Sequence, residues 1–182
     1  LSGSGVALSA GDGGLLKHTD SGITVSLGHT SADAETVHAA ADHGATHVTH
    51  TFNAQTPLNH RAPGVPGAAL VDDRLNCEVI SDGIHLHPDV VRLLMRCKGK
   101  EHTVAITDAM EAAGMPDGDY TLGGQAVKVE GKYATLADGT LAGSVTDLMS
   151  CMRTAVSFGI PLADAVRAAA VNPAQVLGIY DR

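Results

Sequence analysis

Four short apolar runs, each rich in β-branched residues and each followed by a polar residue, recur along this 182-residue chain. They occupy residues 23–27, 47–49, 77–80 and 103–106, and a weaker run at 6–8 is a further strand candidate. Their length and composition are typical of buried strands. Helical patterns separate them, and strands that alternate with helices form right-handed βαβ units around a parallel sheet. This alternation of strands and helices therefore predicts an α/β fold.

Capping residues and apolar periodicity mark the predicted helices. They span residues 30–44, 88–98, 145–158 and 162–171. Thr30 or Ser31 is expected to cap the first helix, and Ser144 is expected to open the third. Pro173 should end the fourth helix, because proline lacks the backbone donor that a helix interior needs.

The pattern changes between residues 114 and 143, where Gly-rich alternating segments predict a β-hairpin inserted before the late helices. A complete (β/α)8 barrel usually takes about 250 residues. The chain is therefore expected to form a partial or truncated (β/α)8 TIM-type barrel, with residues 1–182 as a single partial domain. It begins with Leu1 rather than Met, so we expect that its natural beginning is missing.

Composition excludes several classes of protein. A content of 44% apolar residues with a net charge of −8 argues against a disordered chain and against a nucleic-acid binder, which needs clustered Lys and Arg. No run reaches the roughly 20 apolar residues that cross a bilayer. Three distant cysteines without a CxxC motif, Cys77, Cys97 and Cys151, predict reduced core residues of a cytoplasmic protein.

Three polar side chains, His29, His50 and Asp108, directly follow predicted strands. In an α/β barrel, the catalytic side chains lie at the carboxyl ends of the strands. Imidazoles bind zinc-like cations, which acidify water, and a neighbouring carboxylate can carry the proton. The trio thus indicates metal-assisted hydrolysis. The structural alternatives are hydrogen-bonded structural histidines and an aspartate that only caps the next turn.

Further polar groups could bind a ligand. Asn53 and Arg61 follow His50, and the planar fork of Arg61 suits phosphate or carboxylate, although a Pro/Gly-rich turn with a surface arginine explains them equally well. His85 could hydrogen-bond a hydroxyl group. The turn at 139–144 is either an anion or carbonyl site or simply a well-capped helix start. The other histidines are expected to be solvated or hydrogen-bonded: His18, His38, His43, His47, His60, His87 and His102.

Six segments, in order between about Gly22 and Gly178, resemble the N-acetylglucosamine-6-phosphate deacetylase family of the amidohydrolase superfamily. They read SLGHTSAD, THVTHTFNA, APGVPGAAL, ISDGIHLHP, VAITDAM and GTLAGS. The resemblance depends on their order, on the 21-residue step from His29 to His50, and on the Thr-Asp-Ala at 107–109.

This resemblance implies a metal-dependent hydrolase of amino-sugar metabolism that converts N-acetylglucosamine 6-phosphate into glucosamine 6-phosphate and acetate. It implies that His29 and His50 bind a catalytic divalent metal, commonly zinc. Asp108 would then be the general base and acid, which takes a proton from the attacking water and protonates the departing amine.

The resemblance also implies the residues that bind the substrate. Asn53, the backbone of Ala54 and Arg61 would bind the phosphate, with Arg61 reaching into the site of a neighbouring subunit. His85 would contact the sugar. A homodimer is expected for that reason.

The resemblance does not extend to the family's third metal ligand, a glutamate in a His-Leu-Glu-Gly-Pro-type motif. The candidates that precede His29 are Asp12, His18 and Asp20, and none lies in a matching motif. Two alternatives therefore stay open. One is a catalytically incomplete fragment or sugar-phosphate-binding module, and the other is a different amidohydrolase, such as a dihydroorotase-like enzyme, which would not need Arg61.

Overall fold

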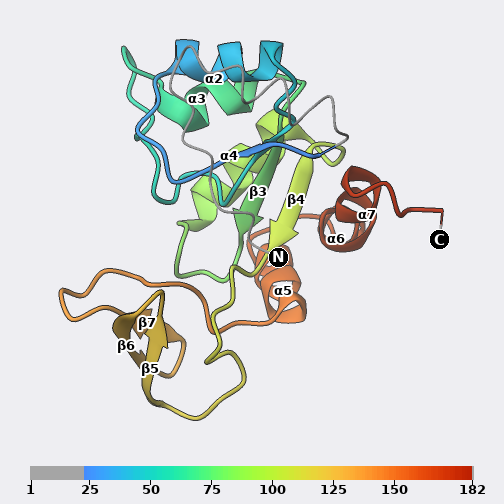
Figure 1. The fold of residues 1–182 in the computed structure, drawn as a ribbon. Helices are drawn as coiled ribbons and strands as arrows, with labels where there is room; N and C mark the ends of the chain where they lie inside the picture. The colour runs from blue at the N-terminus through green and yellow to red at the C-terminus, as the bar shows by residue number, and fades with distance from the viewer. Residues whose placement is uncertain (1–22, 182) are drawn as a thin grey trace.

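The main sheet has four parallel strands in the order β1-β2-β3-β4 (Figure 1). The computed structural model describes residues 23–181. The strands are β1 (Ser26–Leu27), β2 (His47–Val48), β3 (Asn76–Ile80) and β4 (Thr103–Ile106). All four coincide with the predicted runs, which confirms the parallel α/β arrangement. The strand candidate at 6–8 lies outside the described residues.

The carboxyl ends of the strands lie at one edge of the sheet, and β3 and β4 extend three residues farther there than β1 and β2, because Val48 at the end of β2 pairs with Cys77 of β3. Leu27 pairs with Val48 across β1 and β2, and Ile80 pairs with Ile106 across β3 and β4. Because the strands are parallel, the residues that follow them are brought to the same edge. Within the described residues, β1 and β4 are the outer strands of this sheet.

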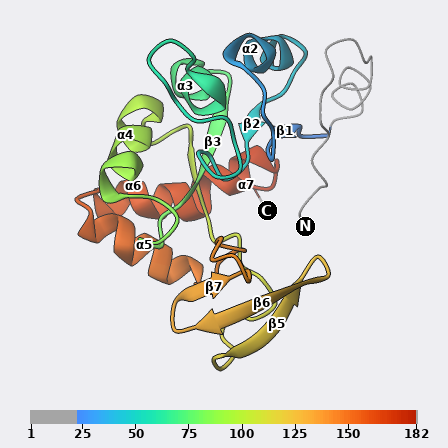
Figure 2. The same cartoon turned by 90° about the vertical axis from the view of Figure 1, so that its left-hand side faces the viewer.

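Three helices cover one face of the sheet (Figure 2). They are α2 (Ala34–Asp42), α3 (Gly64–Val71) and α4 (Pro88–Lys98). The largest apolar cluster joins these helices to Val48 of β2 and Val79 of β3. Successive residues of a strand point to opposite faces, so His47 and Glu78 face away from this helical layer.

The start of α2 differs from the prediction. Asp33 caps the helix, because its carboxylate accepts a hydrogen bond from the backbone N–H of Thr36 at 2.9 Å. Thr30 instead forms an isolated β-bridge with Gln55. The expected cap at Thr30 or Ser31 is therefore wrong, since the backbone of Thr30 is held at the edge of the sheet.

The start of α5 (Leu148–Ser157) also lies later than predicted. Asp147 is its cap and accepts a hydrogen bond from the Ser150 N–H at 2.8 Å. Ser144 does not open this helix, because its backbone pairs with the segment that follows β4.

Helix α3 was not predicted, because its sequence contains two glycines and a proline, which have low helix propensity. Burial of Val65, Ala69 and Leu70 in the main core supports it instead. By contrast, α4 begins at Pro88 and is followed by Gly99, as predicted.

The last helical segment continues beyond its predicted end. It consists of α6 (Leu162–Val166), the π-helical turn η1 (Arg167–Val171) and α7 (Asn172–Val176). Pro173 lies in the first turn of α7, where its missing N–H is tolerated after a wider turn. The Asn172 side chain donates hydrogen bonds of 2.7 Å to the carbonyls of Lys100 and Thr103, which fastens this segment to the start of β4.

A second, antiparallel sheet occupies the region between β4 and α5, where the hairpin was predicted. Its strands are β5 (Gly118–Leu122), β6 (Gln125–Glu130) and β7 (Tyr133–Thr135). Figures 1 and 2 show it beyond the carboxyl end of β4, at the opposite end of the molecule from α2 and α3. It has its own small core, which includes Val127, Val129 and Met110.

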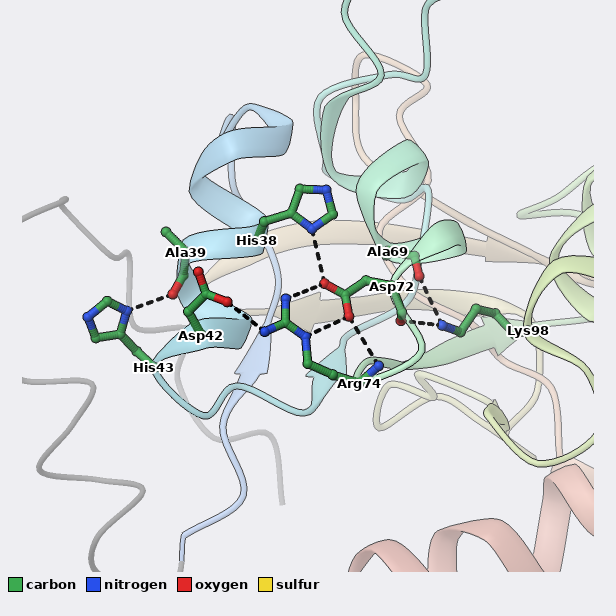
Figure 3. Close-up of polar contacts among 8 residues, drawn as sticks. All are labelled: His38, Ala39, Asp42, His43, Ala69, Asp72, Arg74 and Lys98. Atoms are coloured by element: carbon green, nitrogen blue, oxygen red, sulfur yellow. Dashed lines mark hydrogen bonds and ion pairs between the residues drawn. The ribbon is translucent and has the colours of Figure 1, made fainter.

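A polar network around Asp72 ties the helical layer together (Figure 3). Arg74 donates to its carboxylate through Nε at 2.8 Å and Nη2 at 2.7 Å, and His38 Nδ1 lies 3.0 Å from it. The hydrogen bonds from Arg74 lower the pKa of Asp72. The buried Lys98 ammonium donates to the carbonyls of Ala69 and Asp72. This network joins residues that precede β2, β3 and β4, and not the residues that follow their carboxyl ends, so we interpret it as structural.

Cys77 and Cys151 are buried and unpaired, as expected, whereas Cys97 is exposed on α4. The prediction of a core position is therefore wrong for Cys97, which lies on the outer face of its helix. None of the helices in the described part of the chain is long and apolar enough to span a membrane.

Candidate active site

His29 and His50 meet at the carboxyl edge of the parallel sheet. Each follows its strand by two residues, after Leu27 of β1 and Val48 of β2. Their ring centroids lie 4.6 Å apart, with an interplanar angle of 78°. His50 is buried and His29 is exposed, so the pair forms a rim that opens to solvent.

The backbone at this edge is strained. Among residues 23–181, five non-glycine residues have a positive φ: His29 (47°), His50 (32°), Phe52 (79°), Ala54 (49°) and Asp108 (49°). This left-handed conformation costs an ordinary residue about 1–2 kcal/mol. All five lie in the loops after β1, β2 and β4. Strain that is confined to one edge is typical of a functional site, because it gives side chains directions that a regular strand does not allow.

Gly28 allows the first two strand ends to approach. A Cβ atom at Gly28 would lie 2.9 Å from the Cβ of Thr49, closer than real side chains come. The Thr49 N–H also donates to the Leu27 carbonyl at 2.8 Å. A side chain at position 28 would therefore separate His29 from His50.

Glu78 holds His50 from within the sheet. Its Oε2 atom accepts a hydrogen bond from the backbone N–H of His50 at 3.2 Å, and its carbonyl accepts one from Thr51 at 2.9 Å. Burial raises the pKa of Glu78, and the charge of Asp108 raises it further. Glu78 was not among the predicted site residues, because it lies inside β3 and not beyond the end of a strand. A lone acid in the middle of a buried strand was the available signal.

Asp108 lies near this pair. Burial lowers the pKa of His50, while the nearby Asp108 carboxylate opposes this effect and His29 adds to it. Asp108 is exposed, and it follows β4 as His50 follows β2. The structure thus places the three predicted chemical groups at one edge, with Asp108 in electrostatic reach of His50.

The two histidines fit a metal ion as two members of a ligand set. The buried Nδ1 atom of His50 has no hydrogen-bond partner within the described residues, and neutral imidazole is a common ligand for zinc-like cations. Within residues 23–181, no group of three or more His, Cys, Asp or Glu side chains is arranged to hold a metal. Catalytic zinc sites usually have three protein ligands, so His29 and His50 could supply two of them and a third ligand would be needed.

The loop after His50 carries Asn53 and Arg61, the two side chains that the sequence predicts to bind an anion. The Asn53 side chain donates to the His50 carbonyl at 3.3 Å. Asn59 and Ala62 exchange backbone hydrogen bonds of 3.0 and 3.2 Å, which forms a tight turn with Arg61 at its exposed tip. Within the described residues, Arg61 has no carboxylate partner, so its guanidinium is available to an external anion.

His85 is fixed by a carboxylate. Its Nδ1 atom lies 2.7 Å from Oδ2 of Asp82, and both side chains are largely buried. Burial raises the pKa of Asp82, but hydrogen bonds from His85 and Ile84 outweigh it, so the net shift is downward. Asp82 holds Nδ1 of His85, which leaves Nε2 as the ring atom that can meet a ligand.

One histidine outside the site differs from expectation. His47 is 3% exposed, and neither of its ring nitrogens has a hydrogen-bond partner in the described part of the chain. The expectation that it is solvated or satisfied is therefore wrong. It faces the inner side of the sheet, where burial lowers its pKa to about 4.

Residues 14–182 match the amidohydrolase family, and the chain belongs to that family. Its curated relatives include the N-acetylglucosamine-6-phosphate deacetylase of Bacillus subtilis, 44% identical over 92% of this chain and 43% of the relative. The N-acetylgalactosamine-6-phosphate deacetylase of Escherichia coli O157:H7 is also 44% identical, over 86% of this chain and 42% of the relative. The chain thus spans less than half the length of these relatives.

Solved structures show the same relationship. A Mycobacterium smegmatis N-acetyl-D-glucosamine-6-phosphate deacetylase, an aspartate-to-alanine mutant in complex with N-acetyl-D-glucosamine-6-phosphate, has a TM-score of 0.88 at 39% identity. The match covers 91% of this chain and 45% of that one. The Pasteurella multocida N-acetylglucosamine-6-phosphate deacetylase has a TM-score of 0.88 at 32% identity, over 92% of this chain and 44% of its own.

Proposed function

We propose that this chain carries the chemical groups of a metal-dependent deacetylase that hydrolyses the acetamide of an N-acetylhexosamine 6-phosphate. The observation that carries the proposal is the gathering of His29, His50 and Asp108, all with left-handed backbones, at one edge of a parallel sheet. Two relatives that are 44% identical to this chain over the aligned residues have this activity in their names.

In this proposal, His29 and His50 are two ligands of a divalent metal, with zinc preferred by their imidazole donors. A metal held there would acidify water and polarise the amide carbonyl. Asp108 accepts a proton from the attacking water and delivers it to the departing amine. The products are acetate and the free amino sugar.

The remaining predicted residues orient the substrate. His85 donates to or accepts from a sugar hydroxyl through Nε2, held in place by Asp82. Asn53, the backbone of Ala54 and Arg61 bind the phosphate. Because Arg61 lies at an exposed turn tip, we propose that it serves the site of a second subunit in a homodimer. β1–β4 would be four strands of a (β/α)8 barrel.

N-acetylglucosamine 6-phosphate is the first candidate substrate, since most of the relatives compared act on it by name. The galactosamine epimer is the second, because a relative named for it is equally identical to this chain. Acetate release from each sugar phosphate, measured with the zinc-loaded protein, tests both.

Release from either epimer, and its loss in Asp108→Asn, is the expected result. A protein that binds the sugar phosphate without releasing acetate would be a binding module instead. Hydrolysis of a dihydroorotate-type ring amide with no need for Arg61 would assign it to another branch of the family.

A further inference from the structure

Ser144 contacts the segment that carries Asp108 at three points. Its hydroxyl donates a hydrogen bond to the carbonyl of Thr107. Its backbone N–H donates to the carbonyl of Asp108 at 3.0 Å, and its own carbonyl accepts from the N–H of Met110 at 2.9 Å. Ser144 is 2% exposed, so these bonds are shielded from water.

The direction of the Asp108 carboxylate depends on this segment. Within residues 23–181, no hydrogen bond to the carboxylate is present, and the side chain is exposed. The backbone therefore fixes the Cα–Cβ bond from which the carboxylate extends, and with it the positions that the carboxylate can reach. That backbone is left-handed, with φ of 49°, a conformation that persists only where the surroundings impose it.

Ser144 is itself fixed from the other side. The Ala142 N–H donates to the Ala134 carbonyl at 3.0 Å, and Leu141 forms a β-bridge with Thr135 of β7. The turn before Ser144 is thus anchored on the antiparallel sheet. A role in starting α5 does not explain Ser144, because Asp147 caps that helix.

We propose that Ser144 is a positioning residue, which connects the β5–β7 sheet to the backbone of Asp108 and keeps this backbone in the conformation from which the carboxylate can transfer a proton. This inference rests on the proposed function for its catalytic consequence. The hydroxyl is the part that a mutation can remove, since Ser144→Ala keeps both backbone bonds and loses only the bond to Thr107.

The test compares Ser144→Ala with Ser144→Thr, which retains the hydroxyl. Thr103→Val is the matched control: Thr103 is fully buried at the other end of β4, and its hydroxyl donates to the Gly99 carbonyl at 2.9 Å. The measurements are amide hydrogen exchange of Met110 and Ser144, together with kcat and KM for acetate release by the zinc-loaded protein.

Ser144→Ala is expected to exchange about tenfold faster at both amides and to lose at least about tenfold in kcat, with KM changed less than about twofold, because a misdirected catalytic group slows chemistry more than binding. Ser144→Thr should restore kcat, and Thr103→Val should keep it. Unchanged exchange in Ser144→Ala, or equal loss of kcat in Thr103→Val, would overturn the proposal.

Failure of the proposed function is a separate result. If the unmodified protein releases no acetate from either sugar phosphate, the deacetylase assignment is wrong. Hydrogen exchange then decides alone whether Ser144 holds the Asp108 segment, and faster exchange confined to Ser144→Ala supports it.

Discussion

Glu78 accepts a hydrogen bond from the backbone N–H of His50 at 3.2 Å, although the two residues are 28 positions apart. The bond connects the middle of β3 to the loop after β2. It holds a histidine whose φ of 32° is unfavourable for an ordinary residue. The carboxylate therefore stabilises a conformation that brings His50 beside His29.

Replacing Glu78 tests this link. Glu78→Leu should weaken zinc binding by about 10- to 100-fold, as loss of an outer partner of a metal ligand usually does. Glu78→Gln keeps an acceptor oxygen and should bind zinc within a few-fold of the unmodified protein. Competition with a chromophoric chelator measures both affinities. Equal binding by all three proteins would show that Glu78 does not position His50.

Gly28→Ala should destabilise the chain. The added Cβ would meet the Cβ of Thr49 at 2.9 Å, and overpacking of this kind costs about 1–3 kcal/mol. Gly118→Ala is the control, because a Cβ there meets only the Tyr120 ring at 3.7 Å. Urea denaturation of the two variants gives the comparison, and a free energy of unfolding unchanged in Gly28→Ala would contradict the close approach.

Acid should destabilise the fold through His47. Its pKa falls from 6.5 to about 4 on folding, so the unfolded chain binds the proton more readily between these values. Stability from the neutral ring is therefore present above about pH 6.5 and is lost as the pH falls towards 4, by about 3 kcal/mol in all.

His47→Leu should lack this contribution, and His60→Leu, at an exposed histidine, should retain it. Urea denaturation across this pH range measures the difference. The same slope in His47→Leu and the unmodified protein would show that His47 is not buried in its neutral form.

Arg61→Ala should raise KM for the sugar phosphate by about 10- to 100-fold, because hydrogen bonds to charged groups contribute about 1.5–3 kcal/mol. KM for the sugar without phosphate should change little. Arg61→Lys keeps the charge without the planar fork and should be intermediate. Equal losses for both substrates would place Arg61 outside the phosphate site.

The sequence pattern predicted the strands of the parallel sheet well, but it predicted the first residues of the helices poorly. The runs that form β1–β4 are short, apolar and rich in β-branched residues, and a segment of this kind is buried more readily as a strand than as a helix or a loop. Several residues near the start of a helix can cap it, and tertiary contacts decide which of them does so. Thr30 pairs with Gln55, so Asp33 caps α2 instead. Helix α3 is stabilised by burial and not by helix propensity, so a sequence that contains Gly and Pro did not predict it.

The candidate site was predicted in part for a similar reason. His29, His50 and Asp108 could be found because strand ends share an edge. The contacts of Glu78 and Ser144 could not be predicted, because each side chain hydrogen-bonds a backbone group of a residue far away in the chain. Such contacts depend on the register between strands and on the path of the loops, and a local sequence pattern does not predict either.

The central claim is that His29 and His50 hold a metal while Asp108 moves the proton. It is tested most directly by metal content and acetate release measured together on Asp108→Asn. The account predicts unchanged zinc content and a rate lowered at least about 10²-fold, the usual scale of general acid–base catalysis. Acetate release at the unmodified rate by zinc-loaded Asp108→Asn would contradict it.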